Sequence, residues 1–249
     1  MIDTHCHIYS EYYEDISKLI DEIQEAGIKK IIVNGCDMKS NLEVLELTKK
    51  YDIIYGALGF HPTELDNYND EYIKWLDEHI NDNKIVAIGE IGLDYHYDNI
   101  DKIKQNIVFK KQLEIAKKYN KPIIVHSRDA IKDTYDTLSK YELRGSIHCY
   151  SGSLEMAKEF IKLGYYIGVG GVCTYKNAKN IINVLETIPL TYILLETDSP
   201  YLSPEGKRGE KNTPANIPII VNKISEIKRV TKAEIISITT DNATGLFDF

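Results

Sequence analysis

The chain has 249 residues, of which 43% are hydrophobic and 27% are charged, and its formal net charge is −8. This composition is typical of a globular protein, and the length is sufficient for a large core. An acidic chain has no overall attraction for nucleic acid, so any such contact requires a local basic surface or bound metal ions.

The cysteines indicate the redox environment. Cys6, Cys36, Cys149 and Cys173 form no CxxC pair and suggest no disulfide framework, which is typical of reduced cysteines in an intracellular protein. The chain starts without a basic and apolar leader, and no apolar run approaches the roughly 18–20 residues of a membrane span. We therefore expect a soluble, cytoplasmic protein with no membrane partner and no obligate protein partner.

Short apolar runs alternate with longer amphipathic stretches along the chain. The runs predict strands at 2–7, 31–33, 53–58, 85–88, 122–125, 146–148, 165–169 and 192–195. The stretches between them predict helices at 16–26, from 40 onward, around 72–76, and at 101–119, 130–139, 154–163, 178–186 and 219–227. Capping boxes at Ser40–Glu43 and Thr231–Glu234 would begin the second and the last helix.

Eight strands, each followed by a helix and with no linker between them, imply right-handed parallel crossovers. Such units close naturally into one (β/α)₈ barrel domain over residues 1–249. The alternative is an open doubly wound sheet, which should carry a glycine-rich phosphate turn after its first strand. Here that strand ends in His5-Cys6-His7, which favours the barrel.

Reactive side chains of a (β/α)₈ barrel lie at the carboxyl ends of its strands. Five of the seven histidines fall at these positions, namely His5, His7, His61, His126 and His148. The carboxylates of Glu90 and Asp198 follow the fourth and eighth strands. Imidazoles and carboxylates are the ligands that Zn²⁺ and Mn²⁺ prefer. These candidate ligands exceed the need of one tetrahedral ion and suit two ions roughly 3.5–4 Å apart, with Glu90 the best-placed bridge.

The strand ends also carry longer motifs: Asp-Thr-His-Cys-His (3–7), Gly-Phe-His-Pro (59–62), Ile-Gly-Glu-Ile-Gly-Leu-Asp-Tyr (88–95), Val-His-Ser-Arg-Asp (125–129), His-Cys-Tyr-Ser-Gly (148–152) and Leu-Glu-Thr-Asp-Ser-Pro-Tyr-Leu (195–202). Together they resemble the TatD family of metal-dependent deoxyribonucleases, and the likeness extends over the whole chain. The His-x-His element alone is shared by the wider amidohydrolase superfamily. The resemblance implies a TIM barrel of the metallo-dependent hydrolase type that cleaves phosphodiester bonds in DNA.

The resemblance also implies a ligand set for two divalent ions. This set is compatible with Zn²⁺, Mg²⁺ and Mn²⁺. One ion would be held by His5, His7, Glu90 and Asp198, and the other by Glu90, His126 and His148. Glu90 and Asp198 are the expected catalytic residues, because the amidohydrolase relatives use the aspartate after strand eight to take a proton from the attacking water.

Substrate contacts are expected from three further residues. His61 matches a family histidine that contacts the substrate phosphate, and Arg128 and Arg208 can hold phosphate through their guanidinium groups. The chain departs from the family pattern at His96 and in the loop 203–212, which is shorter and more acidic than expected. These departures bear on substrate preference.

Two classes of reaction remain open on this centre. We expect DNA as the substrate, and tRNA is the alternative partner, through hydrolysis of D-aminoacyl-tRNA or of another ester or amide. A non-catalytic scaffold or metal-storage protein is disfavoured, because such a protein would have no need of a complete set of six ligands.

Overall fold

Eight parallel strands form one sheet whose order follows the sequence. In the computed structural model, which describes residues 1–249, strands β1 to β8 span Ile2–Cys6, Lys30–Asn34, Ile54–Leu58, Ile85–Asp94, Ile123–Arg128, Gly145–Ile147, Tyr165–Val169 and Ile193–Leu195. The ends of the sheet meet where the amide of Asp198 donates to the carbonyl of His5 over 2.9 Å and Cys6 bridges to Ser199. The predicted (β/α)₈ barrel is therefore confirmed.

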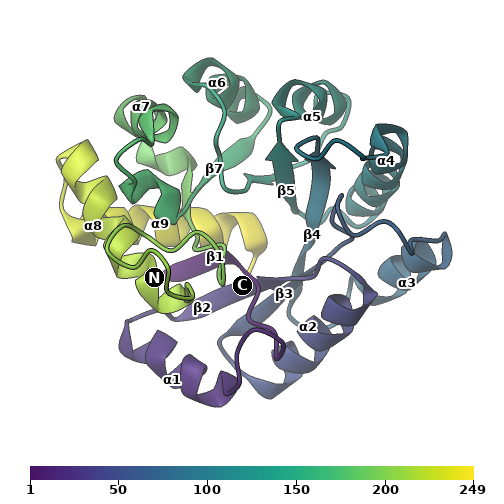
Figure 1. Cartoon of the computed structure of the whole chain (residues 1–249), viewed down its shortest axis with the longest axis horizontal. Coiled ribbons are helices and arrows are strands. Elements are labelled where there is room, and N and C mark those ends of the chain that lie inside the picture. Colours follow the sequence, from purple (N-terminus) through teal and green to yellow (C-terminus); the bar gives the residue numbers. More distant parts are fainter.

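The helices form a ring outside the barrel (Figure 1). Helices α1 to α9 span Ile16–Glu25, Met38–Lys50, Glu71–His79, Lys102–Tyr119, Ile131–Leu138, Leu154–Lys162, Lys179–Thr187, Ile217–Lys228 and Lys232–Phe247. Three short 3-10 helices, η1 to η3, span Gly171–Thr174, Leu190–Tyr192 and Pro214–Asn216. None of the helices combines the length and the apolar character needed to cross a bilayer.

The start of α2 differs from the prediction. The carboxylate of Asp37 accepts the amide of Ser40 over 2.8 Å, and this reciprocal capping box begins the helix at Met38. The predicted Ser40–Glu43 box is wrong, because Glu43 instead accepts the amide of Ser10 from the loop after β1. At α9 the predicted start is confirmed, since the hydroxyl of Thr231 accepts the amide of Glu234.

Two strands carry an extra residue next to predicted ligands. The register of β1 against β2 shifts between Asp3 and Cys6, and that of β4 against β5 shifts between Ile88 and Ile91. Such bulges bend a strand and re-aim its side chains, here those of His5 and Glu90. At Gly89 a Cβ would approach the Cβ of Ile124 to 2.7 Å, so a larger residue would force β4 away from β5.

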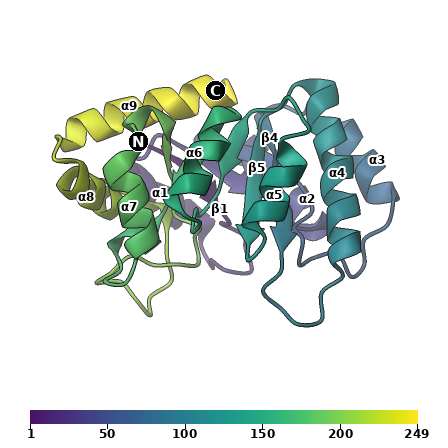
Figure 2. The ribbon, with the colours of Figure 1, turned by 90° about the horizontal axis from the view of Figure 1, so that it is seen from above.

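Helix α9 closes the end of the barrel opposite the loops that follow the strands (Figure 2). Its side chains of Ala243, Leu246 and Phe247 form one buried cluster with strand residues, which are Ile2, Ile32, Ala57, Val86, Ala87, Ile124 and Leu194. This end of the barrel is therefore apolar and closed, and buried polar side chains gather toward the other end.

Replacing Phe247 by alanine should lower the free energy of unfolding by about 3–5 kcal/mol, because it leaves a cavity under the barrel. Asp241→Ala, at an exposed position of the same helix, should change it by less than about 0.5 kcal/mol. Urea unfolding measures both values. Equal stability of the two variants would show that α9 does not support the barrel core.

Candidate metal centre

A first cluster of side chains lies where β1, β4 and β8 end. The Nε2 atoms of His5 and His7 are 3.0 Å apart, and Oε2 of Glu90 lies 3.3 Å and 3.4 Å from them. Oδ1 of Asp198 lies 3.6 Å from each of the two Nε2 atoms. Ligands about 2.0–2.1 Å from a tetrahedral ion are about 3.3–3.4 Å from one another. The two imidazole nitrogens therefore lie close to ligand spacing from each carboxylate oxygen.

A second cluster faces the other oxygen of Glu90. Its Oε1 lies 2.8 Å from Nδ1 of His126, 3.4 Å from Nε2 of His148 and 3.5 Å from Nε2 of His61. The two oxygens of one buried carboxylate thus face two groups of imidazole nitrogens. This is the arrangement that a bridging ligand requires. The six predicted ligands occur in three overlapping groups, which are His5, His7 and Glu90; His5, His148 and Asp198; and Glu90 and His126 with His61.

Hydrogen bonds fix the tautomer of His7 and of His61. Nδ1 of His7 donates to the carbonyl of Asn34 over 3.0 Å, so its Nε2 directs a lone pair into the centre. Both ring nitrogens of His126 instead face carboxylates, Nε2 at 2.9 Å from Oδ2 of Asp94 and Nδ1 at 2.8 Å from Oε1 of Glu90. His61 has the opposite tautomer to His7. Its Nδ1 accepts a hydrogen bond from the amide of Thr63, so Nε2 carries the proton in the neutral ring.

Burial and charge act against each other within the centre. Burial opposes ionisation of Glu90, but the imidazoles of His61, His5 and His148 hold the pKa of its carboxyl well below the usual range. Burial likewise opposes ionisation of Asp198, yet His148 and His7 lower its pKa. The nearby carboxylates overcome burial and raise the pKa of His148 to about 9. Protons on imidazoles thus balance the carboxylates, a role that divalent cations would perform with more charge.

Glu196, to which the sequence reasoning gave no role, lies beside His148 in the centre. It is fully buried at the end of β8, and its Oε1 accepts the amide of Cys149 and lies 3.3 Å from Nδ1 of His148. A Cβ at Gly168 of β7 would come within 2.4 Å of its Oε2, so the glycine makes room for the carboxylate. A carboxylate behind a ligand histidine is a common support for a bound metal. The only sequence signal was a second acidic residue two positions before Asp198.

The two predicted arginines lie in different places. Arg128 lines a cavity of about 710 Å³ over the centre, and its guanidinium lies 5.8 Å from the ring centroid of Tyr97. Arg208 does not line this cavity, and its guanidinium lies over the ring of Tyr175. His61 also lines the cavity, within 3.5 Å of Glu90.

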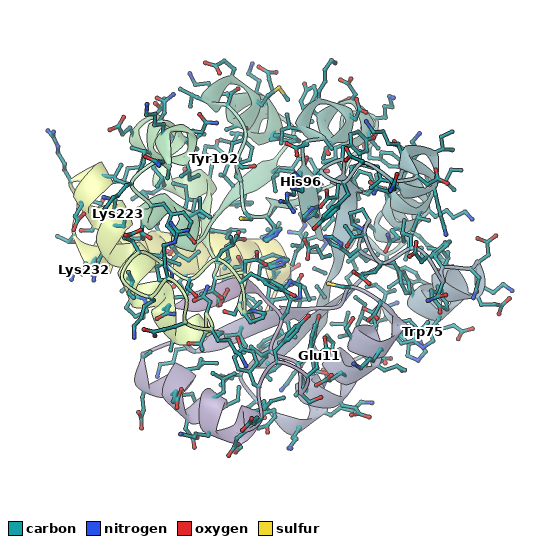
Figure 3. The ribbon with its side chains drawn as sticks, in the orientation of Figure 1. Glu11, Trp75, His96, Tyr192, Lys223 and Lys232 are labelled. Atoms are coloured by element: carbon teal, nitrogen blue, oxygen red, sulfur yellow. The ribbon has the colours of Figure 1, made fainter.

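The rim of the cavity comes from the loops after the strands. Figure 3 shows Glu11 and His96, from the loops after β1 and β4, closer to the barrel axis than Trp75 on α3 or Lys223 on α8. Besides the centre itself, the acidic residues Glu11, Asp37 and Glu64 line the cavity. Arg128 is the only lysine or arginine among the lining residues.

The residues present fit two divalent cations. The lone-pair nitrogen Nε2 of His7, further imidazoles and two ionised carboxylates face one another at ligand spacing. Nδ1 of His126 lies 2.8 Å from Oε1 of Glu90, a contact that requires a proton or a cation between the two atoms. The barrel and this donor set define the class of protein, a metal-dependent hydrolase of the TIM-barrel type.

Comparison with known proteins identifies the family. Residues 2–248 match the family model described as TatD related DNase. The chain is 40% identical to the uncharacterized metal-dependent hydrolase YabD of Bacillus subtilis over 99% of this chain and 98% of YabD. The chain belongs to the TatD family of metal-dependent hydrolases.

Solved structures agree with this assignment. The crystal structure of YjjV, a TatD homolog from Escherichia coli, superposes with a TM-score of 0.96 at 34% identity and covers 100% of this chain and 98% of that one. A TatD family hydrolase from Entamoeba histolytica shares the fold, with a TM-score of 0.85 at 24% identity over 99% of this chain and 97% of that one.

Glu196→Gln should weaken the binding of a divalent cation at the centre by about 10- to 100-fold, because the carboxylate behind His148 loses its charge. Titration calorimetry with Mn²⁺, together with metal analysis after dialysis, measures this change. Glu186→Gln, at an exposed position of α7, serves as the control. Unchanged affinity for the cation in Glu196→Gln would remove this residue from the metal centre.

Proposed function

We propose that the protein is a metal-dependent nuclease that hydrolyses phosphodiester bonds in DNA, using two divalent ions held by His5, His7, Glu90, His126, His148 and Asp198. The observation that carries this proposal is the placement of Glu90, whose two oxygens face separate groups of imidazole nitrogens. The family description as TatD related DNase supports DNA as the substrate. A cytoplasmic place of action belongs to the proposal, and all four cysteines are free.

The protein's own groups have distinct roles in this reaction. Bound ions would supply Lewis-acid charge that makes water a stronger acid near neutral pH. Asp198 accepts the proton of the attacking water, because the surrounding imidazoles hold the pKa of its carboxyl low and keep it ionised. His61 carries its proton on Nε2, 3.5 Å from Oε1 of Glu90, and donates it in a hydrogen bond to a phosphate oxygen at the edge of the centre.

Arg128 is the cationic side chain placed to orient the phosphate. It lines the cavity, and a guanidinium can donate two parallel hydrogen bonds to one phosphate group. Arg208 lies outside the lining, so its predicted contact would involve a part of the substrate that extends beyond the cavity.

The acidic rim favours a second candidate, the ester bond of D-aminoacyl-tRNA. Glu11, Asp37 and Glu64 face the cavity, and Glu64 forms no ion pair with a lysine or arginine. A carboxylate there would attract the free α-ammonium group of an aminoacyl ester, whereas it would repel a second phosphate.

Purified protein loaded with Mn²⁺ should cleave labelled single- or double-stranded DNA, and a chelator should abolish cleavage because it removes the ions. The same preparations are to be incubated with D-aminoacyl-tRNA. Deacylation without any chelator-sensitive DNA cleavage would overturn the nuclease proposal and establish the second candidate.

Asp198→Asn should lower kcat by about 10²–10⁴-fold, because an amide cannot accept the proton. Glu64→Gln, a control in the same cavity, should keep kcat on DNA within about two-fold, since Glu64 has no role in the proton transfer. Steady-state kinetics measures kcat, and circular dichroism and metal analysis verify fold and loading. Near-normal turnover by a metal-loaded Asp198→Asn protein would remove Asp198 from the mechanism.

A further inference from the structure

Exposed apolar side chains gather at the metal cavity. Of the seven large hydrophobic residues that the fold leaves exposed, three line this one cavity, namely Tyr97, Tyr201 and Leu202. Tyr201 is 50% exposed and Leu202 is 37% exposed. Contiguous apolar surface that is open to solvent is typical of ligand-binding grooves. Neither the proposed metal binding nor the proposed phosphate binding uses these three side chains.

One turn positions both Tyr201 and a predicted metal ligand. The amide of Tyr201 donates to the carbonyl of Asp198 over 2.9 Å, which closes the turn after β8. The buried side chain of Asn212 donates to the carbonyls of Thr197 and Tyr201 over 2.9 Å and 2.7 Å. The backbone on both sides of Asp198 is therefore fixed, and the ring of Tyr201 stands at a set place beside the centre.

The ring of Tyr201 adjoins the first ligand cluster. Its centroid lies 6.3 Å from that of His7. Its hydroxyl lies 2.9 Å from the hydroxyl of Tyr12, and the two rings meet edge to face at 6.0 Å. Tyr9 continues the aromatic wall at 5.8 Å from Tyr12. Half of the surface of Tyr201 remains open to solvent beside these contacts.

The opposite side of the cavity differs in chemistry. There Tyr97 already lies under the guanidinium of Arg128, so this side offers a cation. No lysine or arginine stacks on Tyr201, and the nearby Glu11 in the cavity lining is paired with Lys39. A planar, uncharged ring therefore suits the Tyr201 side, and a phosphate oxygen suits the Arg128 side.

We propose that Tyr201 and Leu202 form a stacking subsite for one nucleobase of the substrate, next to the ion held by His5 and His7. This inference rests on the proposed nuclease function. An aromatic side chain binds any base through its ring face, so the subsite favours nucleotides over phosphodiesters without bases and is tolerant of sequence.

The test uses the dinucleotide thymidylyl-thymidine and its two analogues in which a tetrahydrofuran residue replaces one of the nucleosides. With the Mn²⁺-loaded enzyme, loss of one particular base should raise KM by about ten-fold or more. Tyr201→Ala should raise KM for the dinucleotide by a similar factor, and it should leave KM for that one abasic analogue unchanged. Tyr201→Phe retains the ring and should remain close to the wild type.

Tyr192→Ala is the matched control, because Tyr192 is 38% exposed but lies in η2, against α9. An equal rise of KM for all three substrates in Tyr201→Ala, or no rise for any, would overturn the subsite. A wild-type enzyme that cleaves none of the three substrates and no DNA would instead overturn the nuclease proposal, and the subsite with it.

Discussion

The structure of the centre depends on one buried carboxylate. Glu90 is 3% exposed, and imidazoles from four strand ends surround it. Desolvation would make an isolated carboxylate at this depth neutral, so its low pKa is a property of its neighbours. Those imidazoles converge only because the strands of a closed barrel end on one rim. The barrel and the centre are therefore mutually dependent, since a shift of β4 would leave a buried charge without partners.

The rest of the barrel is organised around this polar end. A bulge in β4 directs Glu90 inward, and Gly89 permits the close approach of β5 that the bulge requires. At the other end α9 covers the apolar interior, which excludes water from beneath the centre. Buried polar groups around the centre also satisfy one another's hydrogen bonds. One example is the backbone carbonyl of Asn34, which accepts a hydrogen bond from Nδ1 of His7.

The features that could be predicted from the sequence are those set by hydrophobic periodicity and by the residues at the ends of strands. The alternation of apolar runs and amphipathic stretches indicated the barrel, and the position of each histidine after a strand indicated the rim. Features that depend on contacts between distant segments were not predictable. The cap at Asp37, the room that Gly168 leaves for Glu196 and the stacking of Arg208 on Tyr175 all arise from side chains that meet only in the folded chain. The ends of β4 and β5 were also placed too early, because Glu90 and His126 interrupt their apolar runs.

The charge of the centre constrains how an anionic substrate can be held. Burial raises the pKa of Asp3 to about 8, so this residue is largely neutral near pH 7. The carboxylates of Glu90, Asp198, Asp94 and Glu196 would together balance two divalent ions, so the loaded centre has little net positive charge. Attraction of a phosphate must then come from directed contacts such as those of Arg128 and His61, since the rim is acidic. Such contacts are short-ranged and few. The apolar side chains at the opening of the metal cavity would then contribute the remaining affinity. They would also select substrates by the chemical group that is bonded to the phosphate.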